Sequence, residues 1–268
     1  MKTKPQISSA FNPLLCPPYQ AATVGKWRLF SAATIPVPVA GYFAVHAPMP
    51  AEYWVLEKNA VVWMSLTPME MESQGHHARL ATGHVVVMGL GMGALVYNLL
   101  LNQLVTRITV CELEPDVVSL LKMAAPWFAA AVLSGQVEIH IGDAFNFIPT
   151  GNKPDTLIVD IWPKMGPRGE TDTIKIQTNV NAGQVGWWGQ EISYGSWVAK
   201  TFPSKQPPVC HKGQAAAYEQ HLGFKLLGAQ HKNYPTIARQ ANLTLAKIFN
   251  AQATGQIHFP SPAGNVGK

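Results

Sequence analysis

Charged residues are scarce in this chain. Asp, Glu, Lys and Arg make up 13% of its 268 residues, about half the usual share. Apolar residues make up 47%, which excludes the composition of a charge-rich disordered protein. Gly, Asn or Glu interrupts every long apolar stretch, so no run reaches the roughly 18 residues of a membrane span. We therefore expect a folded protein without membrane spans, long enough for one large or two small α/β domains.

Cysteine is scarce too. Cys16, Cys111 and Cys210 lie far apart, and no Cys-x-x-Cys pair occurs. An odd, sparse set of this kind excludes a disulfide framework and a zinc finger. The first 20 residues contain two lysines but no continuous apolar core, which argues against a secretory signal. These absences predict a cytoplasmic protein with reduced thiols.

The net charge of +5 is unevenly distributed. Residues 1–160 contain 9 Lys and Arg against 11 Asp and Glu, whereas residues 161–268 contain 11 against 4. Such asymmetry can indicate an anionic partner. The cations are scattered and form no basic block, so a solvated surface is favoured over nucleic-acid binding.

The N-terminal part, residues 1–80, is predicted to be a small β-rich extension that ends in a lead-in helix. Residues 1–50 are rich in proline and suggest an extended arm with strands at 26–32 and 39–46. Residues 53–66 resemble a hairpin with its turn at Lys58-Asn59.

Residues 67–80 contain a helix-start signal. Thr67 can serve as N-cap, Pro68 occupies the first helical position, and Glu70 follows three residues after the cap. Adjacent His76 and His77 point to different sides of such a helix and rarely share a metal, so a polar helix face is the simplest interpretation.

Residues 81–268 predict a Rossmann-like domain with a divergent C-terminal part. Apolar strand-like runs alternate with helical patterns in units of about 30 residues, which is typical of a parallel sheet with right-handed crossovers. The predicted strands are 84–89, 107–112, 136–143 and 155–160, and the helices are 94–104 and 115–125. Beyond Asp160 no fifth buried strand is evident, and helices are expected at 186–200, 214–222 and 236–249. The fold class is therefore α/β, a three-layer sandwich with a mostly parallel central sheet.

Polar or glycine-rich residues follow each predicted strand. The first strand is followed by Gly89-Leu90-Gly91-Met92-Gly93, the second ends in Glu112, the third is followed by Gly142-Asp143-Ala144, and the fourth ends in Asp160. Ligands of open parallel sheets bind at the carboxyl ends of the strands. Glycines allow close backbone approach, and an acid such as Glu112 can accept both ribose hydroxyls. Together these features predict a nucleoside-containing ligand.

The glycine motif and Glu112 suit NAD or S-adenosylmethionine. Two features favour S-adenosylmethionine. Asp143 can accept a hydrogen bond from the adenine amino group. Asp160 and the aromatic face of Trp162 would lie near the positive sulfonium.

The stretch from VVVMGLGMGALV through VTRITVCELEPDVV and VEIHIGDAFNFI to DTLIVD resembles the spermidine synthase-like branch of class I S-adenosylmethionine-dependent methyltransferases, over about residues 83–162. The resemblance implies that Gly89, Gly91 and Gly93 line the methionine and ribose part, that Glu112 holds the ribose, and that Asp143 and Ala144 hold the adenine. Asp160 aligns with the general base of aminopropyl transfer.

The sequence departs from that family after Asp160. Spermidine synthases continue with Asp-Ser-Ser-Asp-Pro, whose second acid helps to hold the polyamine, whereas this chain has Ile161-Trp162-Pro163. The segment before the glycine strand also lacks the acidic, tyrosine-bearing pattern of polyamine binding; there Glu70 or Gln74 is a candidate cap for the amino-acid end of the cofactor. Trp187 and Trp188, with Gln190 and Glu191, suggest either the floor of a substrate pocket or packing of a late helix on the sheet.

These features predict an S-adenosylmethionine-dependent methyltransferase that acts on a small-molecule acceptor. Polyamine aminopropyl transfer and a non-catalytic S-adenosylmethionine-binding module are the alternatives, and a homodimer is left open. Asp160 is the predicted catalytic residue. The predicted cofactor contacts are Gly89, Leu90, Gly91, Gly93, Glu112, Leu113, Asp143, Ala144, Asp160 and Trp162, with no metal ligand.

Overall fold

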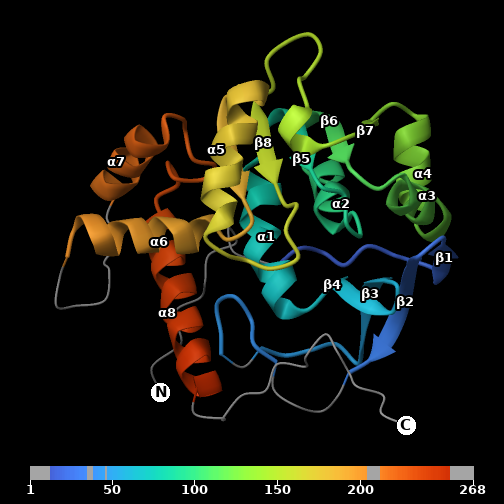
Figure 1. Ribbon diagram of the computed structural model, residues 1–268, viewed down its shortest axis with the longest axis horizontal. Helices are drawn as coiled ribbons and strands as arrows, with labels where there is room; N and C mark the ends of the chain where they lie inside the picture. The colour runs from blue at the N-terminus through green and yellow to red at the C-terminus, as the bar shows by residue number, and fades with distance from the viewer. Residues whose placement is uncertain (1–12, 35–38, 46, 204–211, 254–268) are drawn as a thin grey trace.

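A parallel sheet forms the centre of the protein in the computed structural model, which describes residues 13–34, 39–45, 47–203 and 212–253 (Figure 1). Its strands run in the order β7-β6-β5-β8-β9, and every neighbouring pair is parallel. Their bounds are Gly83–Met88 for β5, Val105–Glu112 for β6, Val137–Ile141 for β7, Thr156–Val159 for β8 and Gln184–Trp187 for β9. The order reverses between β5 and β8, which is where such sheets bind ligands.

Helices cover both faces of this sheet. Alternate residues of β5 enter two different cores: Val85 and Val87 pack with α1 to α4, and Val86 and Met88 pack with α5 to α8. The first group is α1 (Pro68–Leu80), α2 (Ala94–Leu100), α3 (Pro115–Ala124) and α4 (Pro126–Leu133). The second is α5 (Arg168–Val180), α6 (Gln190–Thr201), α7 (Lys212–Leu222) and α8 (Tyr234–Ala253). The predicted three-layer α/β architecture is confirmed.

A smaller antiparallel sheet lies below the parallel sheet in the view of Figure 1. It consists of β1 (Ala22–Val24), β2 (Trp27–Ala33), β3 (Glu52–Lys58) and β4 (Val61–Ser65) in sequential order. The β3–β4 turn is made by Asn59 and Ala60, which both have positive φ angles, one residue later than predicted. The predicted strand at 39–46 is wrong for its described residues, because only a single bridge joins Val39 to Ala47.

The C-terminal part contains a fifth parallel strand that the sequence pattern did not reveal. Strand β9 has only four residues, and Gly186 interrupts its apolar run, so it lacks the length of the other strand signals. It occupies the first two residues of the predicted 186–200 helix, and α6 begins only at Gln190. The later two helices are confirmed at α7 and α8, whereas α4 and α5 were not predicted.

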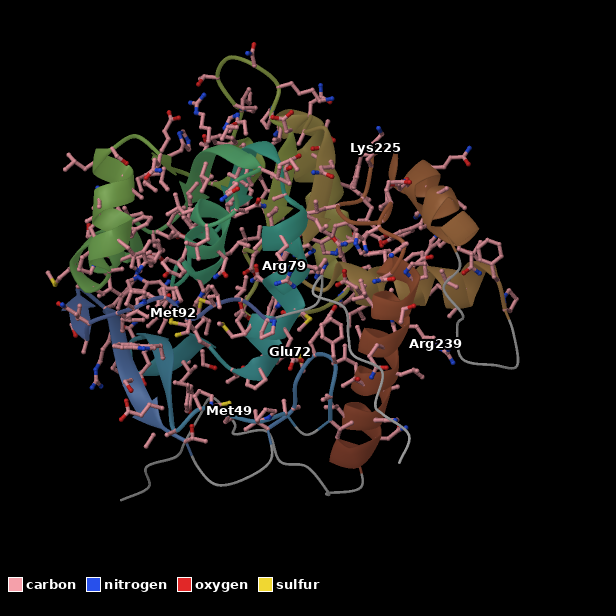
Figure 2. All side chains as sticks on the ribbon, turned by 180° about the vertical axis from the view of Figure 1, so that it is seen from behind. Met49, Glu72, Arg79, Met92, Lys225 and Arg239 are labelled. Carbon is pink, nitrogen blue, oxygen red and sulfur yellow. The ribbon has the colours of Figure 1, made fainter. Side chains whose placement is uncertain are left out.

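The N-terminal sheet shares its core with the parallel-sheet domain. Trp27, Leu29 and Leu56 are buried in the same apolar cluster as Val85 and Val87. Helix α1, on which Figure 2 labels Glu72 and Arg79, lies between the N-terminal sheet and α8. The loop around Phe43 is held to α1, because Phe43 N–H donates to Glu72 Oε2 at 2.9 Å. The domain boundary at residues 80/81 remains a prediction.

Two further expectations concern the thiols and the membrane. Cys16 and Cys111 are free thiols, the first exposed and the second buried, and Cys210 lies outside the described residues. Within the described ranges, no single helix is both long and apolar enough to span a membrane; α3 and α4 meet that test only as a pair bent by 112°.

Candidate functional site

A cavity of about 750 Å³ lies between the N-terminal sheet and the carboxyl ends of the parallel strands. Its volume falls within the roughly 300–1,000 Å³ of small-molecule sites. The antiparallel side contributes Trp27, Tyr53, Lys58, Trp63 and Met64, and the strand ends contribute Gly89, Gly91, Glu112, Asp143 and Asp160. The four strand ends therefore meet at one site, as the sequence predicted.

The glycine turn after β5 packs directly against the end of β8. Gly89 has a φ of +90°, and a Cβ atom there would lie 2.1 Å from the backbone oxygen of Asp160. A side chain at this position is therefore excluded both by its backbone conformation and by the neighbouring strand. The close approach keeps Asp160 at the edge of the cavity.

Glu112 at the end of β6 is bound to the loops on either side of it. Its Oε2 accepts from the Leu90 N–H at 2.7 Å, and its Oε1 accepts from the Glu114 N–H at 2.9 Å. The side chain lines the cavity but is only 8% exposed. Each carboxylate oxygen retains a second acceptor position for a ligand. Glu112 therefore holds the glycine turn in place as well as facing the site.

We expect Glu112→Ala to lower the free energy of unfolding of the unliganded protein by about 1.5–3 kcal/mol, because two backbone N–H groups would lose a charged acceptor. Urea unfolding measures this change. Glu138→Ala is the matched control, since Glu138 is an exposed acid paired with Arg107 on the same sheet, and it should change stability by less than about 1 kcal/mol. Unchanged stability in Glu112→Ala would show that the carboxylate does not support the turn.

Asp143 after β7 also has local partners. Its Oδ1 accepts from the Phe145 N–H at 3.0 Å, and its Oδ2 accepts from Asn146 Nδ2 at 3.3 Å. The residue thereby caps the short helix η2 (Ala144–Asn146). Asp143 and Ala144 both line the cavity, as a contact to the adenine requires, but part of the capacity of the carboxylate is used by the protein itself.

Asp160 belongs to a buried cluster with two residues of α1. Gln74 Nε2 donates to Asp160 Oδ2 at 2.6 Å and to Glu70 Oε1 at 2.9 Å, so one amide joins two carboxyl groups. Burial raises the pKa of Asp160 to about 7, although the Gln74 hydrogen bond opposes the shift. Burial, and then the charge of Asp160, raise the pKa of Glu70 well above its usual value. Both carboxyl groups therefore hold their protons to a higher pH than exposed acids do.

The residues after Asp160 build the far wall of the cavity with α5. Trp162 Nε1 donates to Asp172 Oδ2 at 3.1 Å, and Arg168 lies in the same wall. Neither α5 residue was a sequence candidate, because nothing predicted α5.

The two adjacent tryptophans at the end of β9 have different surroundings. Trp188 lines the cavity and donates to Ser73 Oγ at 2.9 Å, whereas Trp187 is fully buried in the core. The pocket-floor and core-packing interpretations thus each hold for one tryptophan.

The remaining residues predicted to contact the cofactor line either the large cavity or a small hollow next to it. Leu113 and Ala144 line the large cavity, and Leu113 is 66% exposed. Leu90 and Gly93 line a separate hollow of about 20 Å³ beside Glu70, Gln74 and Asp160. All ten predicted residues are therefore at or next to the site, and their roles remain predictions.

His76 and His77 contradict the expectation of a polar helix face. Their side chains are 1% and 0% exposed. His76 Nε2 lies 2.8 Å from Glu191 Oε1 of α6. Helix α1 lies between the N-terminal sheet and the C-terminal helices (Figure 1), and its enclosure there accounts for the burial of both rings.

Residues 69–179 match the family model of the spermine/spermidine synthase domain, which confirms the resemblance to the spermidine synthase-like branch. A spermidine synthase of Schizosaccharomyces pombe is 30% identical over 84 residues, which cover 31% of this chain and 28% of that protein. A spermine synthase of Arabidopsis thaliana is 33% identical over 87 residues, covering 31% of this chain and 24% of the relative. The match thus spans about a quarter of the length of these curated relatives.

Among solved structures, a spermidine synthase from Thermotoga maritima is similar with 12% identity and a TM-score of 0.38, covering 65% of this chain and 54% of that one. The expectation of methyl transfer to a small-molecule acceptor is wrong in light of the family match, which falls on a polyamine-synthase domain and includes the glycine turn, Glu112, Asp143 and Asp160.

Proposed function

We propose that this chain is a transferase that moves an aminopropyl group from decarboxylated S-adenosylmethionine to an amine acceptor. The observation that carries the proposal is the Glu70–Gln74–Asp160 cluster, which brings two carboxyl groups to the end of β8 within the segment that matches the synthase domain. The donor bears a sulfonium and an aminopropyl ammonium, and carboxylates stabilise such positive charge.

The strand ends would hold the nucleoside part of the donor. The glycine turn supplies close backbone approach at Gly89 and Gly91. Glu112 keeps a free acceptor position on each oxygen, which suits the two ribose hydroxyls. Asp143 and Ala144 also line the cavity, and the adenine would lie against them.

Asp160 would act as the general base. The acceptor nitrogen attacks the methylene carbon attached to sulfur, the C–N bond forms as the C–S bond breaks, and the bonding pair stays on sulfur to give methylthioadenosine. The new ammonium must lose one proton, which the Asp160 carboxylate accepts. A pKa of about 7 places this group near the optimum for a base at neutral pH.

The wall formed by Trp162, Asp172 and Arg168 would meet the acceptor. Asp172 is the acid there, but it already accepts from Trp162, and Lys175 Nζ lies 3.7 Å from its Oδ1. Arg168 adds a positive charge to the same wall. These groups disfavour the distal ammonium of a long polyamine, so we expect a short amine to be the preferred acceptor.

The test is incubation of the protein with decarboxylated S-adenosylmethionine and a panel of a monoamine, putrescine and spermidine. We expect methylthioadenosine and an aminopropylated amine in equal amounts, with spermidine the poorest acceptor. Mass spectrometry identifies both products. S-adenosylmethionine serves as the control donor. S-adenosylhomocysteine formed from that control, or an intact donor with every amine, would refute aminopropyl transfer.

A further inference from the structure

A cluster of two imidazoles and one carboxylate lies buried behind the candidate active site. It consists of His76 and His77 on α1 and Glu191 on α6, and the candidate ligand atoms of the three residues lie within 4.8 Å of one another. All three side chains are at most 1% exposed. The site described above uses none of them.

The hydrogen-bonding capacity of this cluster is only partly satisfied by the described residues. His76 Nδ1 has no hydrogen-bond partner among them, whereas His76 Nε2 pairs with Glu191 and the His77 ring has the Gln190 side chain beside it. Burying such a group without a partner costs free energy, so an orphaned nitrogen at the centre of a core indicates a missing ligand. The Gln190 oxygen and the His77 ring both pack against Gly186. The Gln190 oxygen, which could also ligate a metal ion, therefore lies beside the cluster.

We infer that His76, His77 and Glu191 bind a divalent transition-metal ion of the Zn²⁺ type. Imidazole nitrogen and carboxylate oxygen are ordinary Zn²⁺ ligands at about 2.0–2.2 Å. His76 Nε2 now lies 2.8 Å from Glu191 Oε1, and two ligands of a tetrahedral ion would lie about 3.3 Å apart. A small separation of α1 and α6 therefore admits the ion between these two atoms.

A tyrosine orients the carboxylate of the cluster. The second Glu191 oxygen accepts from Tyr42 Oη at 2.9 Å, the kind of outer contact that orients a ligating carboxylate.

A metal at this position would have a structural role with consequences for the cavity. His76 follows Gln74 by two residues on α1, and Glu191 follows Trp188 by three. Fixing α1 to α6 would thus hold the Gln74 amide and the Trp188 ring in register. The inference does not depend on aminopropyl transfer, because it concerns binding and stability alone.

The experiment uses the untagged chain of 268 residues, stripped with a chelator and then titrated with ZnCl₂. We expect about one Zn²⁺ per chain by inductively coupled plasma mass spectrometry after dialysis. At a hundredfold excess over the dissociation constant, the Tm should rise by at least about 5 °C. Co²⁺ in place of Zn²⁺ should give the visible absorption of a low-symmetry site, which Zn²⁺ then removes; this readout needs no variant.

Two variants locate the ion. His77→Gln and Glu191→Gln should each abolish the Tm response and the stoichiometric metal. His140→Gln, which alters an exposed histidine, should retain both. Wild-type protein that takes up no metal, shows no Co²⁺ absorption and has an unchanged Tm would overturn the inference. So would a response that survives in folded His77→Gln and Glu191→Gln proteins.

Discussion

Asp160→Asn is expected to lower turnover by about a hundred- to ten-thousandfold while changing the affinity for the nucleoside part of the donor less than about threefold. General-base assistance contributes an effect of that size. Asparagine keeps the shape of the side chain and an oxygen that can accept from Gln74 Nε2, but it cannot take the proton of the acceptor amine. Steady-state kinetics with decarboxylated S-adenosylmethionine measure the first quantity, and calorimetry with methylthioadenosine measures the second.

Asp155→Asn is the matched control, because Asp155 precedes the other end of β8 and its carboxylate accepts from the His84 N–H at 2.8 Å, outside the cavity. It should leave turnover within about threefold of the wild type. Equal losses of affinity and turnover in Asp160→Asn would assign Asp160 to donor binding. Unchanged turnover would exclude it as the base.

The same residue predicts two pH dependences of opposite sign. Turnover needs the ionised carboxylate, so it should rise with pH through about 7, the pKa of Asp160 in the fold. The unfolded chain loses this proton near the ordinary value of 3.8. Between these values the folded state binds more protons, so the contribution of Asp160 to stability falls as pH rises from about 4 to 7. Urea unfolding across this window should show a weaker decline in Asp160→Asn than in the wild type.

Gly89→Ala should cause the largest loss of stability, about 2–5 kcal/mol, together with loss of detectable donor binding. The added methyl would meet the backbone oxygen of Asp160 at 2.1 Å, and the backbone φ of +90° is strained for alanine. Two neighbouring strand ends would have to separate, which would disrupt the cavity. Urea unfolding and calorimetry measure the two effects.

Gly91→Ala, in the same turn, is the matched comparison. Its φ is +52°, and the added methyl would meet the sulfur of Met64, a flexible side chain that can move aside. The cost should be about 1–2 kcal/mol, the strain of a left-handed alanine. If both variants lost equal stability, the contact between the turn and Asp160 would not be the cause.

The order of the secondary-structure elements made much of the site predictable from the sequence. The buried apolar runs that became β5, β6 and β8 are continuous, since both faces of a parallel sheet are covered. Their carboxyl ends must lie at one edge, so the sequence by itself predicts that the glycine turn, Glu112 and Asp160 lie together. Strand β9 was not predicted, because its four residues are interrupted by Gly186 and show no such run.

Only the tertiary structure decided which side chains share a hydrogen bond or a core. Gln74 precedes Asp160 by 86 residues, and no local pattern indicates that its amide joins Glu70 to Asp160. The burial of His76 and His77 likewise depends on α6 and the N-terminal sheet enclosing α1. Local spacing determined the strands and turns, because backbone geometry acts over a few residues. The pairing of distant polar groups was decided by the packing of whole elements, which alone sets their burial and therefore their chemistry.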